Sequence, residues 1–128
     1  MQLPQRIVVV DDERSVRTGL ANLLQSEGYL TDAFESAESL LGNEAAMATA
    51  ALFIIDVQLK GMDGFELFIH LTRRLEKPPG IIISGNGDDS MLRYAFDLGA
   101  IAFLPKPIEI DILFEHIRQE FSSKAAPQ

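Results

Sequence analysis

The sequence predicts an α/β fold in which helices cover both faces of a five-stranded parallel sheet. Short apolar runs alternate with stretches whose apolar residues recur at helical spacing, along the whole of the 128 residues. Three of the runs are apolar throughout, as expected of strands buried on both faces: residues 7–10, 52–55 and 81–83. The length fits a single domain.

The first strand and helix lie at the N-terminal end. Residues 6–10 form a β-branched run that ends at Asp11 and Asp12. From residue 13 the apolar positions recur at i, i+4, i+7 and i+8, which predicts a helix ending before Gly28. Asp12 is placed to cap this helix.

The next elements are shorter. Residues 29–34 mix polar and apolar side chains, which indicates an edge strand. Ser36 is placed to cap a short helix over residues 36–41. The alanine-rich residues 43–50 are compatible with a helix or with a connection, and both remain open.

A central strand over residues 52–56 ends in Asp56, and a turn over residues 61–64 leads to a helix over residues 65–75. An unpaired carboxylate at the tip of an apolar strand is costly. The rest of the chain is therefore expected to supply Asp56 with partners.

The C-terminal half continues the alternation. Its predicted elements are a buried strand over residues 81–83, a helix over 90–98, a strand over 101–104 and a helix over 109–121. Ser84 and Lys106 follow the two strands. We predict one domain over residues 1–122, with residues 123–128 as a flexible tail or the start of a linker.

Right-handed crossovers leave few topologies for five parallel strands. We predict a flavodoxin-like, doubly wound (βα)5 fold with the order 2-1-3-4-5, because this order puts the three most apolar strands at the centre. The carboxyl ends of the strands then bring five polar residues to one edge of the sheet: Asp11, Asp12, Asp56, Ser84 and Lys106. Open α/β sheets bind their ligands at this edge.

The clustered residues predict a site for phosphoryl groups. Three carboxylates held together repel one another unless cations neutralise them. Lys106 is one such cation, and Mg²⁺ or Mn²⁺ is another, because carboxylates, carbonyls and waters suit hard divalent ions. Asp56 is the candidate acceptor, since aspartyl-phosphates are covalent intermediates in other proteins.

Composition narrows the function classes. The formal net charge is −8, which disfavours direct binding of nucleic acid by this domain. The chain has no cysteine, which excludes disulfides and thiolate metal sites. No signal-like start and no apolar run of membrane-spanning length are present, so we expect a cytoplasmic protein without membrane contact.

The motifs resemble the receiver domain of bacterial two-component response regulators, over nearly the whole chain. The matching pieces are Ile7–Glu13, Phe53–Asp56, Gly61–Gly64, Ile83–Gly85 and Phe103–Pro107. The loop after Ser84 is similar to that of regulators paired with DNA-binding output domains.

The resemblance implies a role for each matched residue. Asp56 would accept a phosphoryl group from the phosphohistidine of a sensor histidine kinase, and Ser84 and Lys106 would bind that group. Asp11 and Asp12 would hold Mg²⁺ together with Asp56 and the backbone carbonyl of Gln58. Such a domain is not an enzyme in the usual sense, because it catalyses only its own phosphorylation and dephosphorylation.

The resemblance also implies a switch. Phe103 would turn inward when Ser84 moves toward the phosphoryl group, and Lys106–Pro107 would be a cis peptide. Gln58 and Asn86 occupy the positions where the family tunes dephosphorylation. The face formed by the helix over 90–98, the strand over 101–104 and the helix over 109–121 would signal to an output domain or partner, including a homodimer.

The loop after Asp56 departs from the family, which often has Met where this chain has Leu59 and commonly has Pro where it has Lys60. The lysine puts the loop geometry in question. Lys60 suggests one alternative, an unphosphorylated scaffold of the same fold, and an aspartyl-nucleophile phosphatase is a second, independent alternative. The second is disfavoured because such phosphatases usually carry a second Asp where this chain has Gln58.

Overall fold

The computed structural model describes residues 3–125 and contains a five-stranded parallel sheet with the order β2-β1-β3-β4-β5. The strands are β1 (Arg6–Val10), β2 (Leu30–Phe34), β3 (Leu52–Asp56), β4 (Gly80–Ser84) and β5 (Ala102–Pro105). The predicted fold class and strand order are confirmed.

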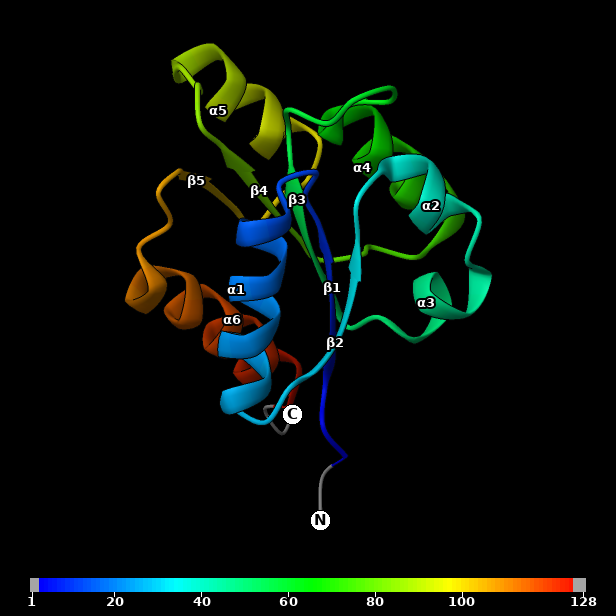
Figure 1. Cartoon of the computed structure of the whole chain (residues 1–128), viewed down its shortest axis with the longest axis vertical. Helices are drawn as coiled ribbons and strands as arrows, with labels where there is room; N and C mark the ends of the chain where they lie inside the picture. Colours follow the sequence, from blue (N-terminus) through cyan, green and yellow to red (C-terminus); the bar gives the residue numbers. More distant parts are fainter. Residues whose placement is uncertain (1–2, 126–128) are drawn as a thin grey trace.

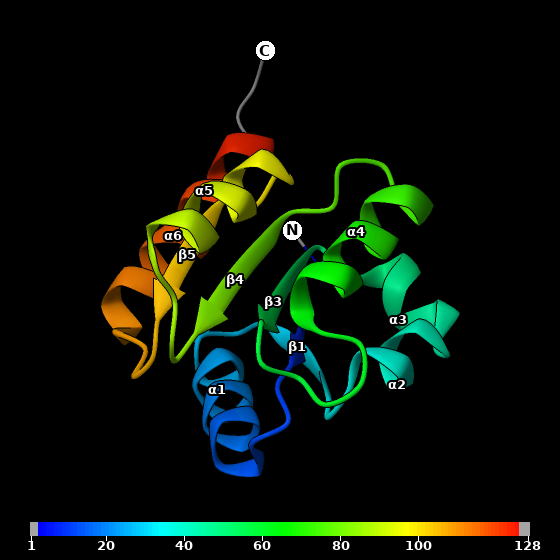
Figure 2. The same ribbon diagram turned by 90° about the horizontal axis from the view of Figure 1, so that it is seen from above.

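Helices cover both faces of the sheet. They are α1 (Arg14–Ser26), α2 (Ala37–Leu41), α3 (Glu44–Thr49), α4 (Gly64–Arg74), α5 (Asp89–Asp97) and α6 (Ile110–Ala125). Figures 1 and 2 show α1 on one side of the sheet and α2, α3 and α4 on the other. The alanine-rich stretch that the sequence left open is therefore helical, and the Asn43 side chain caps it by accepting a hydrogen bond from the amide of Ala46.

The core consists of two layers separated by the sheet, because successive strand residues point to opposite faces. Val8 and Val10 pack with α2, α3, α4 and α5, whereas Ile7 and Val9 pack with α1 and α6. The strands β3 and β4 are buried along their whole length, and β1 is buried after Arg6. The three apolar runs are thus the central strands, as the sequence predicts.

The start of the first helix and the end of the last helix differ from the predictions. Asp12 was expected to cap α1, but this is wrong: the N-cap residue is Glu13, and the carboxylate that accepts a hydrogen bond from its amide, at 2.8 Å, belongs to Asp11. Asp12 instead belongs to a cluster of acids with Asp11 and Asp56. The last helix continues past residue 122, where we expected a tail; residues 126–128 lie outside the described part of the chain.

Over the residues that the structure describes, no helix has both the length and the apolar character that crossing a bilayer requires.

Candidate functional site

The acidic cluster forms where β1 and β3 end. These strands are parallel neighbours with Val10 paired to Ile55, so the residues that follow them meet at the same edge of the sheet. Carboxylate oxygens of Asp11, Asp12 and Asp56 all lie within 4.8 Å of one another. Asp11 and Asp56 are buried and Asp12 is half-buried.

Lys106 extends from the end of β5 into this cluster. Its Nζ lies 3.1 Å from Asp56 Oδ2, 3.0 Å from Asp11 Oδ2 and 2.9 Å from Glu13 Oε1. The predicted convergence of the lysine on Asp56 is therefore observed, and the Lys106–Pro107 peptide is cis, as the resemblance implies. The ion pair with Glu13 was not foreseen, although Glu13 directly follows the two aspartates in the sequence.

The charges of the cluster perturb one another. Burial raises the pKa of the Asp56 carboxyl, the nearby Asp11 carboxylate adds to the rise, and the hydrogen bond from Lys106 offsets part of it. Burial alone would lower the pKa of Lys106, but the surrounding carboxylates outweigh burial and raise it above the ordinary value. Lys106 is therefore a permanent cation near neutral pH.

One lysine does not satisfy the cluster. Asp11 Oδ2 is buried and accepts no hydrogen bond, since its contact with Lys106 is an ion pair without hydrogen-bond geometry. A buried carboxylate oxygen that shares one ammonium group with two other carboxylates, and that lies beside two further aspartates, fits a hard divalent cation such as Mg²⁺. Within residues 3–125, Asp11, Asp12 and Asp56 form the cluster of acids whose carboxylates would hold it.

Ser84 lies buried at the tip of β4, where Gln58 and Asn86 contact it. Its Oγ accepts hydrogen bonds from Gln58 Nε2 and from the Asn86 amide, both at 3.1 Å. The Ser84 hydroxyl also lies 3.3 Å from Gln58 Oε1, to which it donates. The backbone of Gln58 is held in turn, because its N–H donates a hydrogen bond to Asp56 Oδ1 at 3.1 Å.

Phe103 lies on β5 and is half-buried against the core cluster under α2 to α5. Its ring faces the β4–α5 loop: a Cβ added to Gly87 would come within 2.6 Å of Phe103 Cζ and 3.5 Å of Ser84 Cβ. The ring is thus adjacent to the loop that carries Ser84, and its inward rotation stays a prediction.

The loop after Asp56 is ordered without the family proline. Leu59 is buried, its amide donates to the carbonyl of Val57 at 3.0 Å, and Lys60 is exposed. The carboxylate of Glu38 on α2 accepts a hydrogen bond from the Met62 amide at 2.9 Å. This long-range anchor was missed, because nothing in the local sequence connects Glu38 with Met62.

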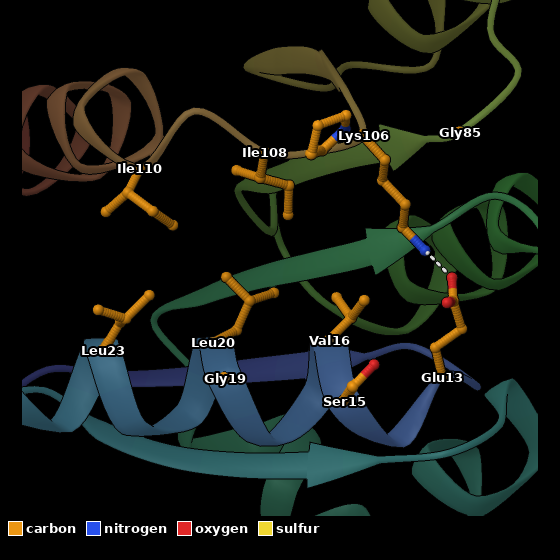
Figure 3. Close-up of a pocket in the computed structure, with 11 residues that line it drawn as sticks. Glu13, Ser15, Val16, Gly19, Leu20, Leu23, Gly85, Lys106, Ile108 and Ile110 are labelled. Carbon is orange, nitrogen blue, oxygen red and sulfur yellow. Dashed lines mark hydrogen bonds and ion pairs between the residues drawn. The ribbon is translucent and has the colours of Figure 1, made fainter.

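A groove of about 560 Å³ opens beside Lys106, between α1 and the segment before α6. Figure 3 shows the side chains of Val16, Leu20 and Ile108 facing each other across it, with Lys106 at one end bonded to Glu13. The groove therefore offers an apolar surface directly next to the ammonium group of the site.

The comparison with known families decides the assignment. A family model described as the response regulator receiver domain matches residues 7–118. The chain belongs to this family.

Several regulators are similar to this receiver domain. The response regulator protein TmoT of Ectopseudomonas mendocina is 36% identical over 122 residues, covering 95% of this chain and 54% of that protein. The transcriptional regulatory protein FixJ of Bradyrhizobium diazoefficiens is 34% identical over 107 residues, covering 84% of this chain and 52% of that protein. This chain thus spans about half the length of these relatives.

Solved structures agree on the fold. The response regulator StyR superposes with a TM-score of 0.85 at 36% identity, covering 96% of this chain and 62% of that chain. The BeF3-activated receiver domain of DrrB superposes with a TM-score of 0.85 at 22% identity, covering 94% of this chain and 99% of that chain. The second likeness concerns the fold alone.

Proposed function

We propose that Asp56 is the phosphoacceptor of this receiver domain and takes its phosphoryl group from the phosphohistidine of a sensor histidine kinase. The observation that carries the proposal is the environment of Asp56: a buried carboxylate at a strand tip, 3.1 Å from Lys106 Nζ and within 4.8 Å of two further carboxylates. A carboxylate with a purely structural role at a strand end is stabilised by a cation or hydrogen-bond donors, and two further carboxylates beside it would only destabilise it. The clustering of acids around Asp56 therefore favours a functional role.

The transfer is a substitution at phosphorus. An oxygen of Asp56 forms the new P–O bond while the P–N bond to the donor histidine breaks and the imidazole leaves with the bonding electrons. Lys106 compensates the charge of the phosphoryl oxygens, and Ser84 donates a hydrogen bond to one of them. Bound Mg²⁺, held by Asp11, Asp12, Asp56 and the carbonyl of Gln58, would balance further charge on these oxygens.

Phosphorylation is proposed to act as a switch. Movement of Ser84 toward the phosphoryl group would free space for Phe103, whose ring lies against the same loop. The face formed by α5, β5 and α6 would then change its affinity for an output domain or for a second copy of the chain. An output domain is supported by FixJ, a transcriptional regulatory protein of which this chain matches only about half.

Incubation with acetyl phosphate and Mg²⁺ tests the phosphoacceptor. Intact-protein mass spectrometry should show one added phosphoryl group on the unchanged chain and none on Asp56→Asn. Asp63→Asn is the matched control, because Asp63 is a nearby aspartate whose side chain caps α4 instead of joining the cluster. An unchanged chain that stays unmodified, or an Asp56→Asn chain that is modified, would refute the proposal.

The switch has its own test. Sedimentation velocity with and without beryllofluoride and Mg²⁺ should show a change from monomer to dimer if the α5–β5–α6 face binds a second copy. An unchanged sedimentation coefficient would remove the homodimer and leave the output domain as the partner.

A further inference from the structure

The side chain of Gln58 connects the loops that follow β3 and β4. Its Nε2 lies 3.1 Å and its Oε1 3.3 Å from Ser84 Oγ, and the same Oε1 accepts a hydrogen bond from the Gly85 amide at 3.3 Å. Its backbone is fixed by the hydrogen bond to Asp56 Oδ1. An exposed glutamine thus makes three contacts with one loop, although the chemistry at Asp56 needs none of them.

These contacts occupy the hydrogen-bonding capacity of Ser84. A hydroxyl has one proton to donate and two lone pairs to accept with. Ser84 Oγ accepts from the Asn86 amide and from Gln58, and it donates to Gln58. Turning the amide of Gln58 over would still leave it paired with the hydroxyl.

The phosphorylated site needs the same proton. Ser84 binds a phosphoryl oxygen only by donating to it, because the oxygens of a phosphoryl group on Asp56 are acceptors. The hydroxyl must therefore leave Gln58 Oε1 when it turns toward Asp56. The bond that Ser84 donates to Gln58 Oε1 and the bond that it donates to the phosphoryl group therefore exclude each other, because both use the one hydroxyl proton.

We propose that Gln58 is a latch that stabilises the unphosphorylated arrangement of the β4–α5 loop by holding the Ser84 hydroxyl and the Gly85 amide. The inference rests on the proposed function, since it concerns the same phosphoryl site. A latch that must open before binding lowers the apparent affinity by the fraction of molecules that are open. Gln58 is a positioning residue in this role and acts on the site through Ser84.

The latch differs from an effect on attacking water, which would change only the lifetime of the phosphorylated state. Beryllofluoride separates the two, because it occupies the phosphoryl position without being hydrolysed. A relative has already been described in this form, as the BeF3-activated receiver domain of DrrB. The experiment is a calorimetric titration with beryllofluoride at saturating Mg²⁺, so that changes in metal affinity do not contribute.

Two substitutions release the latch in different ways. Gln58→Met keeps the length of the side chain and removes its hydrogen bonds, whereas Gln58→Asn keeps an amide and shortens the reach. Both should bind beryllofluoride about 2- to 10-fold more tightly than the unchanged chain, the factor that corresponds to losing one net hydrogen bond. Unchanged or weaker binding by Gln58→Met would overturn the inference, as would an effect of Gln58→Met that Gln58→Asn does not share.

A double-mutant cycle assigns the effect to Ser84. In a Ser84→Ala chain the hydroxyl that the latch holds is absent, so adding Gln58→Met should change the affinity less than twofold. A gain in the double mutant equal to that in Gln58→Met alone would show that the glutamine acts elsewhere. If the unchanged chain neither binds beryllofluoride nor accepts a phosphoryl group from acetyl phosphate, the proposed function fails first and separately.

Discussion

Charge at single residues governs the stability of the site. Asp11 and Asp56 are buried with a carboxylate neighbour each, and Lys106 is the cation that contacts both. The raised pKa of Asp56 reports that burial outweighs the help from this lysine. The clustered acids lower the stability of the ligand-free chain, a cost that is consistent with the proposed binding of a cation and a phosphoryl group.

Replacing one acid should therefore stabilise the metal-free domain. Asp12→Asn removes a charge that repels the other carboxylates without emptying a buried space, because Asp12 is half-buried. The free energy of unfolding, measured by urea denaturation in the presence of EDTA, should rise by about 0.5–1 kcal/mol. Asp111→Asn, an exposed acid in the first turn of α6, serves as the control for a general charge effect. A loss of stability in Asp12→Asn, or an equal gain in both variants, would contradict this account.

At the scale of elements, α4 is positioned by β3, the strand that carries Asp56. The helix starts at Gly64, and a Cβ there would overlap the carbonyl oxygen of Asp56 and lie 2.9 Å from the Cα of Val57. Because these atoms belong to the backbone, no rotamer change relieves the overlap. The β3–α4 connection is thus packed against the site at its N-terminal end and held by Glu38 further along.

Gly64→Ala should be strongly destabilising. The added methyl group forces α4 away from β3, and overpacking of this kind costs roughly 1–3 kcal/mol. Chemical denaturation measures the loss. The matched control is Gly19→Ala in α1, where nothing lies within 4 Å of the new Cβ and a gain of about 0.5–1 kcal/mol is expected from helix propensity. Similar effects at both positions would show that the close approach at Gly64 does not constrain the chain.

The start of α5 gives a pH-dependent test. Asp88 caps this helix by accepting hydrogen bonds from the Met91 amide and the Ser90 hydroxyl, and these bonds lower the pKa of Asp88 below its ordinary value of 3.8. A lowered folded-state pKa means that the stabilisation is present above the unfolded value and disappears as the pH falls through the folded value. Asp88→Asn keeps a capping side chain without the titration.

Urea denaturation of the two chains at several pH values measures this contribution. The unchanged chain should exceed Asp88→Asn in stability near pH 7, and the difference should shrink as the pH falls below about 4. A difference that is constant from pH 7 to pH 3 would show that the carboxylate contributes nothing beyond its capping geometry.

At the scale of the whole molecule, the sheet separates two apolar layers and presents all the chemistry at one edge. The apolar groove lies beside Lys106 at that edge. The α5–β5–α6 face includes β5, the strand that ends at Pro105 just before Lys106. A ligand at the edge therefore couples to the global stability, because the ends of β1 and β3 belong to the central strands of the core.

Magnesium should stabilise the whole domain by mass action. At 100 times its dissociation constant, a ligand that binds only the folded chain adds about 2.7 kcal/mol to the free energy of unfolding. Thermal unfolding should therefore shift to higher temperature with Mg²⁺, by several degrees in a domain of this size. The shift should be much smaller in Asp12→Asn, which lacks one candidate ligand. Equal shifts in both chains would place the ion elsewhere.

The sequence determined the sheet and the identities of the reactive groups. Uninterrupted apolar runs such as residues 52–55 require burial on both faces, and that requirement alone makes them central strands with Asp56 at a tip. The sequence also predicted Ser36 as a helix cap, because a capping motif depends only on neighbouring residues. Local patterns did not distinguish Asp11 from Asp12 as the acceptor of the Glu13 amide just before α1, since adjacent aspartates look alike in sequence.

Only the tertiary structure decided the contacts between distant segments. The pairing of Glu38 with Met62, of Lys106 with Glu13 and of Gln58 with Ser84 each depends on where separate loops meet. Such contacts are set by the packing of helices on the sheet, which fixes distances that no periodicity encodes. The sequence therefore determined which groups reach the edge of the sheet, and the packing decided which of them hold one another there.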